Sequence, residues 1–264
     1  MCHICSHIKK VPKVCEKCKS FKIDSLGIGS QQLEKEVGRL FPKAKTIRID
    51  SDSLKHKDKY KIYYDMIKNN KVDIIIGTQI IAKGLDIENV NLIGVVLADI
   101  GLSIPDYVTS ENIYNLIVQV SGRTSRKEDK GEVIIQTYNP DNPILRFAIK
   151  SDYKKFYEYE IKERERYNYP PFSHISKIII QNFDKQKAKN KAYKIYKELK
   201  KYIKAEKMNT DIYITIPLIF KKFKKYTYNI ILKDKNNKNI ENLLSKIKIS
   251  SKIKIDRDPI SLTN

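Results

Sequence analysis

Cysteine is absent from this sequence after residue 18, and long apolar runs are absent throughout. No segment reaches the roughly 18 consecutive apolar residues expected of a membrane-spanning helix. The first residues, MCHICSHIKK, have the pattern of neither a signal peptide nor an amphipathic presequence. These absences predict a soluble, cytoplasmic protein that has no membrane segment.

The cysteines stand in two Cys-x-x-Cys pairs, Cys2 with Cys5 and Cys15 with Cys18. Structural disulfides are seldom confined to so short a segment, so a reducing compartment and a metal ion fit this pattern better. Thiolates at this spacing can enclose one tetrahedral Zn²⁺, and free thiols are the alternative. We predict a partial zinc-binding module over residues 1–21.

Positive charge is in large excess, because 52 Lys and Arg against 31 Asp and Glu give a formal net charge of +21. Such an excess favours a polyanionic partner, with nucleic acid as the first candidate. Residues 151–264 hold 28 basic and 13 acidic residues, a net +15, which leaves 24 and 18, a net +6, for residues 1–150. The last third is therefore the expected phosphate-binding surface. The alternative is a compositional bias that places lysines on a solvated surface.

Short apolar segments alternate with helical patterns over residues 22–145. Ser30 is the expected N-cap of the first helix, and Pro42 ends it. Short β-branched runs are typical of buried parallel strands, so the order predicts an α/β domain with a parallel sheet. We expect strands over 22–28, 45–49, 72–76, 92–98 and 132–137, and helices over 30–40, 58–69 and 110–120.

A charged, tyrosine-rich segment over residues 143–168 predicts one long connecting helix, which Pro170 and Pro171 end. We place a linker at residues 146–171 and a C-terminal α+β domain at residues 172–264. The expected order in that domain is strand (174–183), helix (185–205), strand (211–216), strand (226–233), helix (237–247) and strand (252–256).

Two polar segments follow apolar ones in the first domain. Gly77 to Asp86 comes directly after a predicted strand, where parallel α/β sheets bind their ligands. Gln119 to Arg126 ends an apolar helix and carries Arg123 and Arg126, whose planar guanidinium groups suit phosphate oxygens. The alternatives are an ordinary strand-to-helix turn and a solvated helix end.

A third segment interleaves cations with aromatic rings. Its cations can follow phosphates while rings meet bases. The alternative is a solvated lysine turn beside a strand whose tyrosines pack inward. The lysines are Lys221, Lys222, Lys224 and Lys225, and the nearby rings are Phe223, Tyr226 and Tyr228.

Together these segments resemble the C-terminal half of the PriA family, superfamily 2 DNA helicases of primosome assembly. The resemblance covers essentially the whole chain and implies a RecA-like second helicase lobe over residues 22–145. It is carried by Leu26-Gly-Ile-Gly-Ser-Gln-Gln-Leu-Glu, Leu40-Phe-Pro, Arg48-Ile-Asp-Ser-Asp52, Gly77 to Asp86, Leu97-Ala-Asp99, Pro105-Asp106, Gln119 to Arg126, Gln136-Thr-Tyr-Asn-Pro140, Tyr169-Pro-Pro-Phe172 and Ile255-Asp-Arg-Asp-Pro259.

The resemblance also implies roles for single residues, because in such helicases the second lobe closes over ATP held by the first. Gly84 and Asp86 match the motif that couples nucleotide to DNA, with Thr78, Gln79 and Lys83 near the DNA backbone. Gln119, Arg123 and Arg126 match the closing motif, whose arginines stabilise charge on the γ-phosphate. Ser125 departs from the family's glycine, which puts catalytic competence in doubt.

For the cysteines, the family implies a module of eight that holds two zinc ions, in which the two pairs found here bind different ions. The upstream pairs are absent from this sequence. Either one unusual site forms from the four cysteines, or the module is incomplete and labile. His3 and His7 are substitute ligands or bystanders.

No Gly-x-x-x-x-Gly-Lys-Ser/Thr loop stands in the sequence, so ATP with Mg²⁺ is expected only together with a first helicase lobe. The start inside the zinc region suggests a truncated or split gene product, or a wrongly assigned start codon.

The expected function is part of an ATP-dependent 3′ to 5′ DNA helicase for primosome assembly and restart of stalled replication forks. The alternatives are a stand-alone zinc-containing DNA-binding module without ATPase activity, and a decayed product. Expected partners are branched or single-stranded DNA, single-strand-binding protein, other primosome proteins and a separately encoded N-terminal helicase half.

Overall fold

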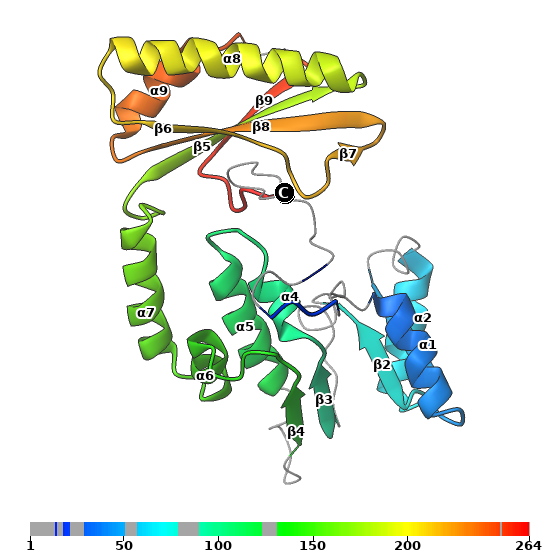
Figure 1. Ribbon diagram of the computed structural model, residues 1–264. Helices are drawn as coiled ribbons and strands as arrows, with labels where there is room; N and C mark the ends of the chain where they lie inside the picture. The colour runs from blue at the N-terminus through cyan, green and yellow to red at the C-terminus, as the bar shows by residue number, and fades with distance from the viewer. Residues whose placement is uncertain are drawn as a thin grey trace. The chain divides into compact units, whose positions relative to one another are not determined.

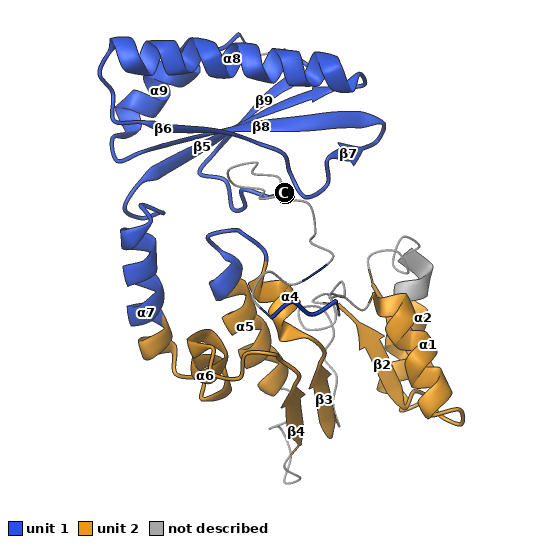
Figure 2. Ribbon diagram, viewed as in Figure 1, with its two compact units in different colours: residues 1–21, 104–110, 157–264 blue, residues 22–103, 111–156 orange. Residues whose placement is uncertain are grey.

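A computed structural model describes residues 14, 18–21, 29–50, 57–78, 90–122, 131–248 and 250–263 (Figure 1). The chain divides into two compact units, coloured separately in Figure 2: unit 2 holds residues 22–103 and 111–156, and unit 1 holds residues 1–21, 104–110 and 157–264. Residues 104–110 lie within the predicted lobe in sequence, yet they pack with the C-terminal part of the chain.

The first half of unit 2 is a parallel strand pair with two helices. Its elements are α1 (Ser30–Leu40), β1 (Thr46–Ile49), α2 (Lys57–Lys68) and β2 (Ile74–Gly77). β1 and β2 pair in parallel, which confirms the predicted strand direction. Ile47 and Ile49 are buried, and Tyr63, Met66 and Ile67 of α2 pack against them. Alternate residues of β1 thus supply this core, as a pleated strand requires.

The start of α1 differs from the prediction that Ser30 caps it. Gly29, which has no side chain that could make a capping bond, is the N-cap, whereas Ser30 is the first helical residue. The Ser30 hydroxyl donates to Asp50 Oδ2 at 2.8 Å. A carboxylate is a stronger acceptor than a neutral oxygen, so this hydroxyl serves a long-range contact instead of a local cap.

The second half of unit 2 contains β3 (Leu92–Val95), α4 (Ala98–Leu102), most of α5 (Thr109–Ser121), β4 (Glu132–Ile135), α6 (Pro143–Ile149) and the beginning of α7 (Tyr153–Arg166). β3 and β4 pair in parallel. Both strands alternate between exposed and partly buried residues, so the prediction of a buried strand over residues 92–98 is wrong for β3. One face packs, through Val95 and Ile135, on a cluster that includes Ile117, Leu145 and Phe156.

Two predicted elements of unit 2 are shorter than expected. β3 ends at Val95 because Leu97 adopts a left-handed conformation, with φ 52°, and α4 begins at once. The single helix predicted over residues 143–168 is two helices, α6 and α7. Ser151 between them has φ 51°, and Asp152 Oδ1 accepts from the Lys155 amide at 3.1 Å. That bond satisfies a free amide of a new helix, which favours a restart over continuation.

The C-terminal domain in unit 1 has the predicted strand and helix order, with one additional short strand. Its elements are β5 (His174–Asn182), α8 (Lys185–Ala205), β6 (Asp211–Thr215), β7 (Lys221–Lys222), β8 (Lys225–Asp234), α9 (Asn237–Ser245) and β9 (Ile253–Arg257). The sheet order is β6-β8-β5-β9, with β7 beside β8, and every pairing is antiparallel. This is the order of a split β-α-β, ferredoxin-like fold.

The two faces of that sheet are covered differently. Figure 1 shows α8 and α9 together over one face, where Ile178, Ile180 and Ile230 contact the buried stripe of α8. The stripe repeats at helical spacing, and consists of Ala188, Ala192, Ile195, Leu199 and Ile203. The many lysines of α8 occupy its other positions, so the apolar stripe accounts for a helix in this lysine-rich segment. The opposite face contains a smaller cluster around Ile175, Ile231 and Leu262.

Candidate nucleotide and DNA interface

The carboxyl ends of β1 and β2 form one edge of unit 2. Ile49 lies opposite Gly77 in the parallel register, so Asp50 and Thr78 leave the sheet at the same edge. Thr78 is exposed there, as a residue near a DNA backbone would need to be. The other residues predicted for this loop, Gln79, Lys83, Gly84 and Asp86, lie outside the described residues.

A partly buried ionic network supports this edge. Asp50 is buried and accepts from Ser30 and from the Arg48 guanidinium. Arg48 Nε also donates to Glu34 at 2.8 Å. Burial works to lower the pKa of Arg48, but the hydrogen bonds and charges of Glu34 and Asp50 outweigh it and raise that pKa. The network joins α1 to the end of β1. The sequence pattern indicates Arg48 and Asp50 only as part of a family motif and carries no signal for this network.

A second carboxylate lies beyond the ends of β3 and β4. Asp99 accepts from the Thr137 hydroxyl and from the Tyr138 amide, both at 3.0 Å. Its burial favours the neutral acid, but these hydrogen bonds outweigh the burial and lower the pKa of Asp99. The ionised carboxylate therefore holds the segment after β4 against α4. It joins Leu97-Ala-Asp99 to Gln136-Thr-Tyr-Asn-Pro140, two of the segments that carry the family resemblance.

Gln119 lies near the end of α5 and is exposed. Ile113, Tyr114 and Ile117 of the same helix are buried, so α5 directs its apolar side inward. The predicted apolar helix before the closing motif is therefore present. Arg123, Ser125 and Arg126 lie outside the described residues. Within the described part of the chain, no hydrogen bond or ion pair joins Gln119 to Thr78.

The four predicted DNA-binding lysines of the C-terminal domain lie in one hairpin. β7 pairs with β8, and Lys222 lies opposite Lys225. Lys221, Lys222 and Lys224 are exposed, and Lys225 is partly buried. The tyrosines beside them behave as the alternative proposed: Tyr228 is 5% exposed, and Tyr226 packs on Phe220 with ring centroids 5.4 Å apart. The hairpin thus exposes its lysine cations to solvent, while its tyrosines pack into the core.

The zinc prediction falls mostly outside the described residues, which exclude Cys2, Cys5, Cys15, His3 and His7. Cys18 is described, and it is an exposed free thiol. Among the residues that can be described, no group of three or more His, Cys, Asp and Glu side chains could hold a metal ion. Of the four cysteines proposed as zinc ligands, the described residues thus include Cys18 alone.

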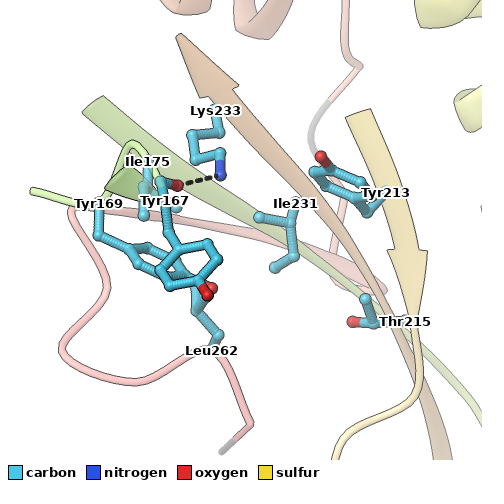
Figure 3. Close-up of a pocket in the computed structure, with 8 residues that line it drawn as sticks. All are labelled: Tyr167, Tyr169, Ile175, Tyr213, Thr215, Ile231, Lys233 and Leu262. Atoms are coloured by element: carbon cyan, nitrogen blue, oxygen red, sulfur yellow. Dashed lines mark hydrogen bonds between the residues drawn. The ribbon is translucent and has the colours of Figure 1, made fainter. Parts of the chain in front are cut away.

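A pocket that the sequence gave no reason to expect lies on the second face of the C-terminal sheet (Figure 3). Its volume is about 170 Å³. The Lys233 ammonium donates to the Tyr167 carbonyl at 2.9 Å and lies 4.9 Å from the centre of the Tyr169 ring. Burial lowers the pKa of Lys233, and the charge of Asp211 partly offsets this. The lining residues are Tyr167, Tyr169, Ile175, Tyr213, Thr215, Ile231, Lys233 and Leu262, none of them a predicted site residue.

No helix in the described part of the chain combines the length and the apolar composition needed to cross a membrane.

Known proteins resemble both the lobe and the whole chain. Residues 3–128 match the model of the helicase conserved C-terminal domain. Replication restart protein PriA is 38% identical over 269 residues in Borreliella burgdorferi, and 35% identical over 263 residues in Bacillus subtilis. The Chlamydia pneumoniae protein of that name is 35% identical over 269 residues. Each alignment covers 99% of this chain but only 40%, 32% and 36% of these relatives, respectively.

The chain thus spans less than half the length of these relatives. The α/β lobe with its parallel strand pairs agrees with the matched helicase domain. The chain belongs to the PriA family of replication restart proteins and corresponds to the C-terminal portion of its members.

Proposed function

We propose that this chain is the second lobe and the DNA-binding end of an ATP-dependent 3′ to 5′ DNA helicase, which assembles primosomes and restarts stalled replication forks in the cytoplasm. The observation that carries the proposal is the helicase C-terminal domain over residues 3–128, in a chain aligned with replication restart proteins along 99% of its length. The common edge of β1 and β2, from which Asp50 and Thr78 emerge, supports it as a ligand-binding edge.

In this proposal, ATP with Mg²⁺ is held mainly by a first helicase lobe and supplies the energy for unwinding. The chain's own contribution is electrostatic and positional. Arg123 and Arg126 stabilise the charge that develops on the γ-phosphate, with Gln119 beside them. Gly84 and Asp86 couple the nucleotide site to the DNA contacts of Thr78, Gln79 and Lys83.

Mixing the full chain with the separately produced first lobe of a relative tests this proposal. We expect DNA-stimulated ATP hydrolysis from the mixture and none from the chain alone. Arg123→Lys and Arg126→Lys should each lower the turnover by about 100-fold or more, because a lysine lacks the planar fork of donors. A mixture that hydrolyses ATP equally well without these arginines would contradict their role.

The lysine hairpin favours a second candidate, a stand-alone DNA-binding module without ATPase activity. Its lysines are presented on a short antiparallel hairpin of the C-terminal domain. This candidate predicts salt-dependent DNA binding by the chain alone, and no activity after the first lobe is added. The ATPase measurement therefore separates the two candidates.

We also propose that Cys2, Cys5, Cys15 and Cys18 bind Zn²⁺, which would hold the N-terminal segment folded. Metal analysis of the purified chain should give about one zinc per chain if the four thiolates share one ion. Replacing Cys15 by serine should release it. Single-strand-binding protein and other primosome proteins are the proposed protein partners, besides branched or single-stranded DNA.

A further inference from the structure

Two exposed phenylalanines flank the lysine hairpin. Phe223 at the hairpin tip is 84% exposed, and Phe183, which follows β5, is 64% exposed. Other aromatic residues nearby contribute to the core: Phe220 meets Tyr228 edge-on at 5.4 Å, and Tyr228 is buried. Phe183 and Phe223 therefore differ from their neighbours, since no core contact accounts for them.

The strand register places the two rings on either side of the lysines. Lys222 of β7 lies opposite Lys225 of β8, and Asn182 at the end of β5 lies opposite Tyr226 of β8. Phe183 comes one residue after Asn182, and Phe223 one residue after Lys222. Adjacent strands lie roughly 5 Å apart, so β7, β8 and β5 bring both rings to one end of the sheet.

Each ring is paired with a lysine cation. The Lys222 ammonium lies 5.5 Å from the centre of the Phe223 ring, and the Lys225 ammonium lies 5.3 Å from that of Phe183. These contacts orient the rings while leaving most of their surface in solvent. A cation beside an exposed aromatic face is the arrangement by which proteins hold a phosphate and the base attached to it.

The backbone conformation of the hairpin turn does not favour phenylalanine. Phe223 and Lys224 have φ 50° and 63°, in the left-handed region that glycine and asparagine adopt most readily. Any other side chain is disfavoured there. Neither the turn nor the core explains Phe223, and its ring is presented to solvent against that conformational preference.

The charged residues around the two rings indicate which class of ligand can bind there. No Asp or Glu occurs from residue 216 to residue 232, a stretch with four lysines. The nearest acid in sequence to Phe183 is Asp184, and its Oδ1 accepts from the Lys187 amide as the cap of α8. An acidic ligand with exposed flat rings fits this surface, and single-stranded nucleic acid has both properties.

We propose that Phe183 and Phe223 stack on unpaired bases of DNA whose phosphates contact the hairpin lysines, so that the hairpin binds single strands in preference to duplex. The inference rests on the proposed DNA binding by the hairpin and adds the strand state that it recognises. Base faces are covered in a duplex and free in a single strand, so stacking discriminates between the two.

The test compares two single-stranded oligonucleotides of equal length and equal charge, one of thymidines and one with abasic sites at its centre. Fluorescence anisotropy on the full chain measures their dissociation constants at fixed salt. We expect the thymidine oligonucleotide to bind about tenfold more tightly, and the Phe183→Ala/Phe223→Ala double variant to lose that difference. Phe223→Tyr should retain it, because tyrosine also stacks.

Phe41→Ala is the matched control, because Phe41 is also an exposed phenylalanine, at 55%, but lies in unit 2. It should leave the preference unchanged. Equal affinity of the unmodified chain for both oligonucleotides, with binding still weakened by salt, would overturn the stacking but retain DNA binding. No binding to either oligonucleotide at low salt would overturn both. Circular dichroism of each variant checks that it is folded.

Discussion

Asp106 Oδ2 accepts a hydrogen bond from the backbone amide of Leu262 at 2.9 Å, although 156 residues separate them. The same oxygen also accepts from the hydroxyls of Ser261 at 2.5 Å and Thr263 at 3.0 Å. One carboxylate thus fixes the end of the chain to residues 104–110, and Leu262 is buried in the cluster with Ile175 and Ile231. This explains why that short segment belongs to the C-terminal unit.

Asp106→Ala should destabilise unit 1 and release the tail. Several buried donors would lose their acceptor, at a cost of about 1–3 kcal/mol in the free energy of unfolding. Asp106→Asn should cost less, because an amide retains one oxygen acceptor. Urea denaturation measures the difference, and limited proteolysis reports release of the tail. Equal stability of all three proteins would show that the tail is held by other contacts.

Asp50→Ala should destabilise unit 2 by about 1–3 kcal/mol, because the hydroxyl of Ser30 and the guanidinium of Arg48 would lose the buried carboxylate that accepts from them. Arg39→Ala is the control, since Arg39 and Glu36 form an exposed pair on α1 at 3.2 Å. Its loss should change stability by less than about 0.5 kcal/mol. Thermal unfolding of the two variants in parallel checks the contrast.

Asp99 should make unit 2 sensitive to acid. Its pKa is lower in the folded state, because the hydrogen bonds from Tyr138 and Thr137 outweigh its desolvation. The associated stability is present above the unfolded-state pKa of about 4 and is lost as the pH falls through the lower, folded-state value. The difference in unfolding free energy between the unmodified chain and Asp99→Asn should therefore shrink from pH 6 to pH 3.

Thr137→Val provides a check on the cause of that pH dependence. Removing one of the donors to Asp99 should reduce the acid sensitivity without abolishing it, because the Tyr138 amide remains. An unchanged acid profile in both variants would mean that another group governs the response.

Replacing Lys221, Lys222, Lys224 and Lys225 by glutamine should weaken DNA binding and flatten its salt dependence. Four neutralised phosphates on a single strand correspond to a change in slope of about 3 in a plot of log K against log salt. Lys35, Lys43, Lys68 and Lys71 are a matched set of exposed lysines in unit 2. The same replacement there should change the slope less. Equal effects would indicate binding through net charge alone.

Much of the fold was predictable because local patterns dominate in each element. The helical spacing of the Lys-rich segment predicted a helix over residues 185–205, which are the bounds of α8. The alternation of strand and helix patterns predicted a strand at each place where the structure has β1 to β4. The Ser30 cap and the single helix over residues 143–168 were wrong. In both places a contact decided the outcome: Asp50 engages the Ser30 hydroxyl, and Asp152 caps a new helix.

The candidate site was predictable to a smaller extent. The sequence alone determined the family, the α/β lobe and the lysine cluster, because motifs and charge are properties of neighbouring residues. Only the tertiary structure decided that Tyr228 is buried while Phe183 and Phe223 are exposed, and that Asp106 holds the C-terminal tail. Those outcomes depend on strand register and on contacts between residues far apart in the chain, for which the sequence pattern carries no local signal.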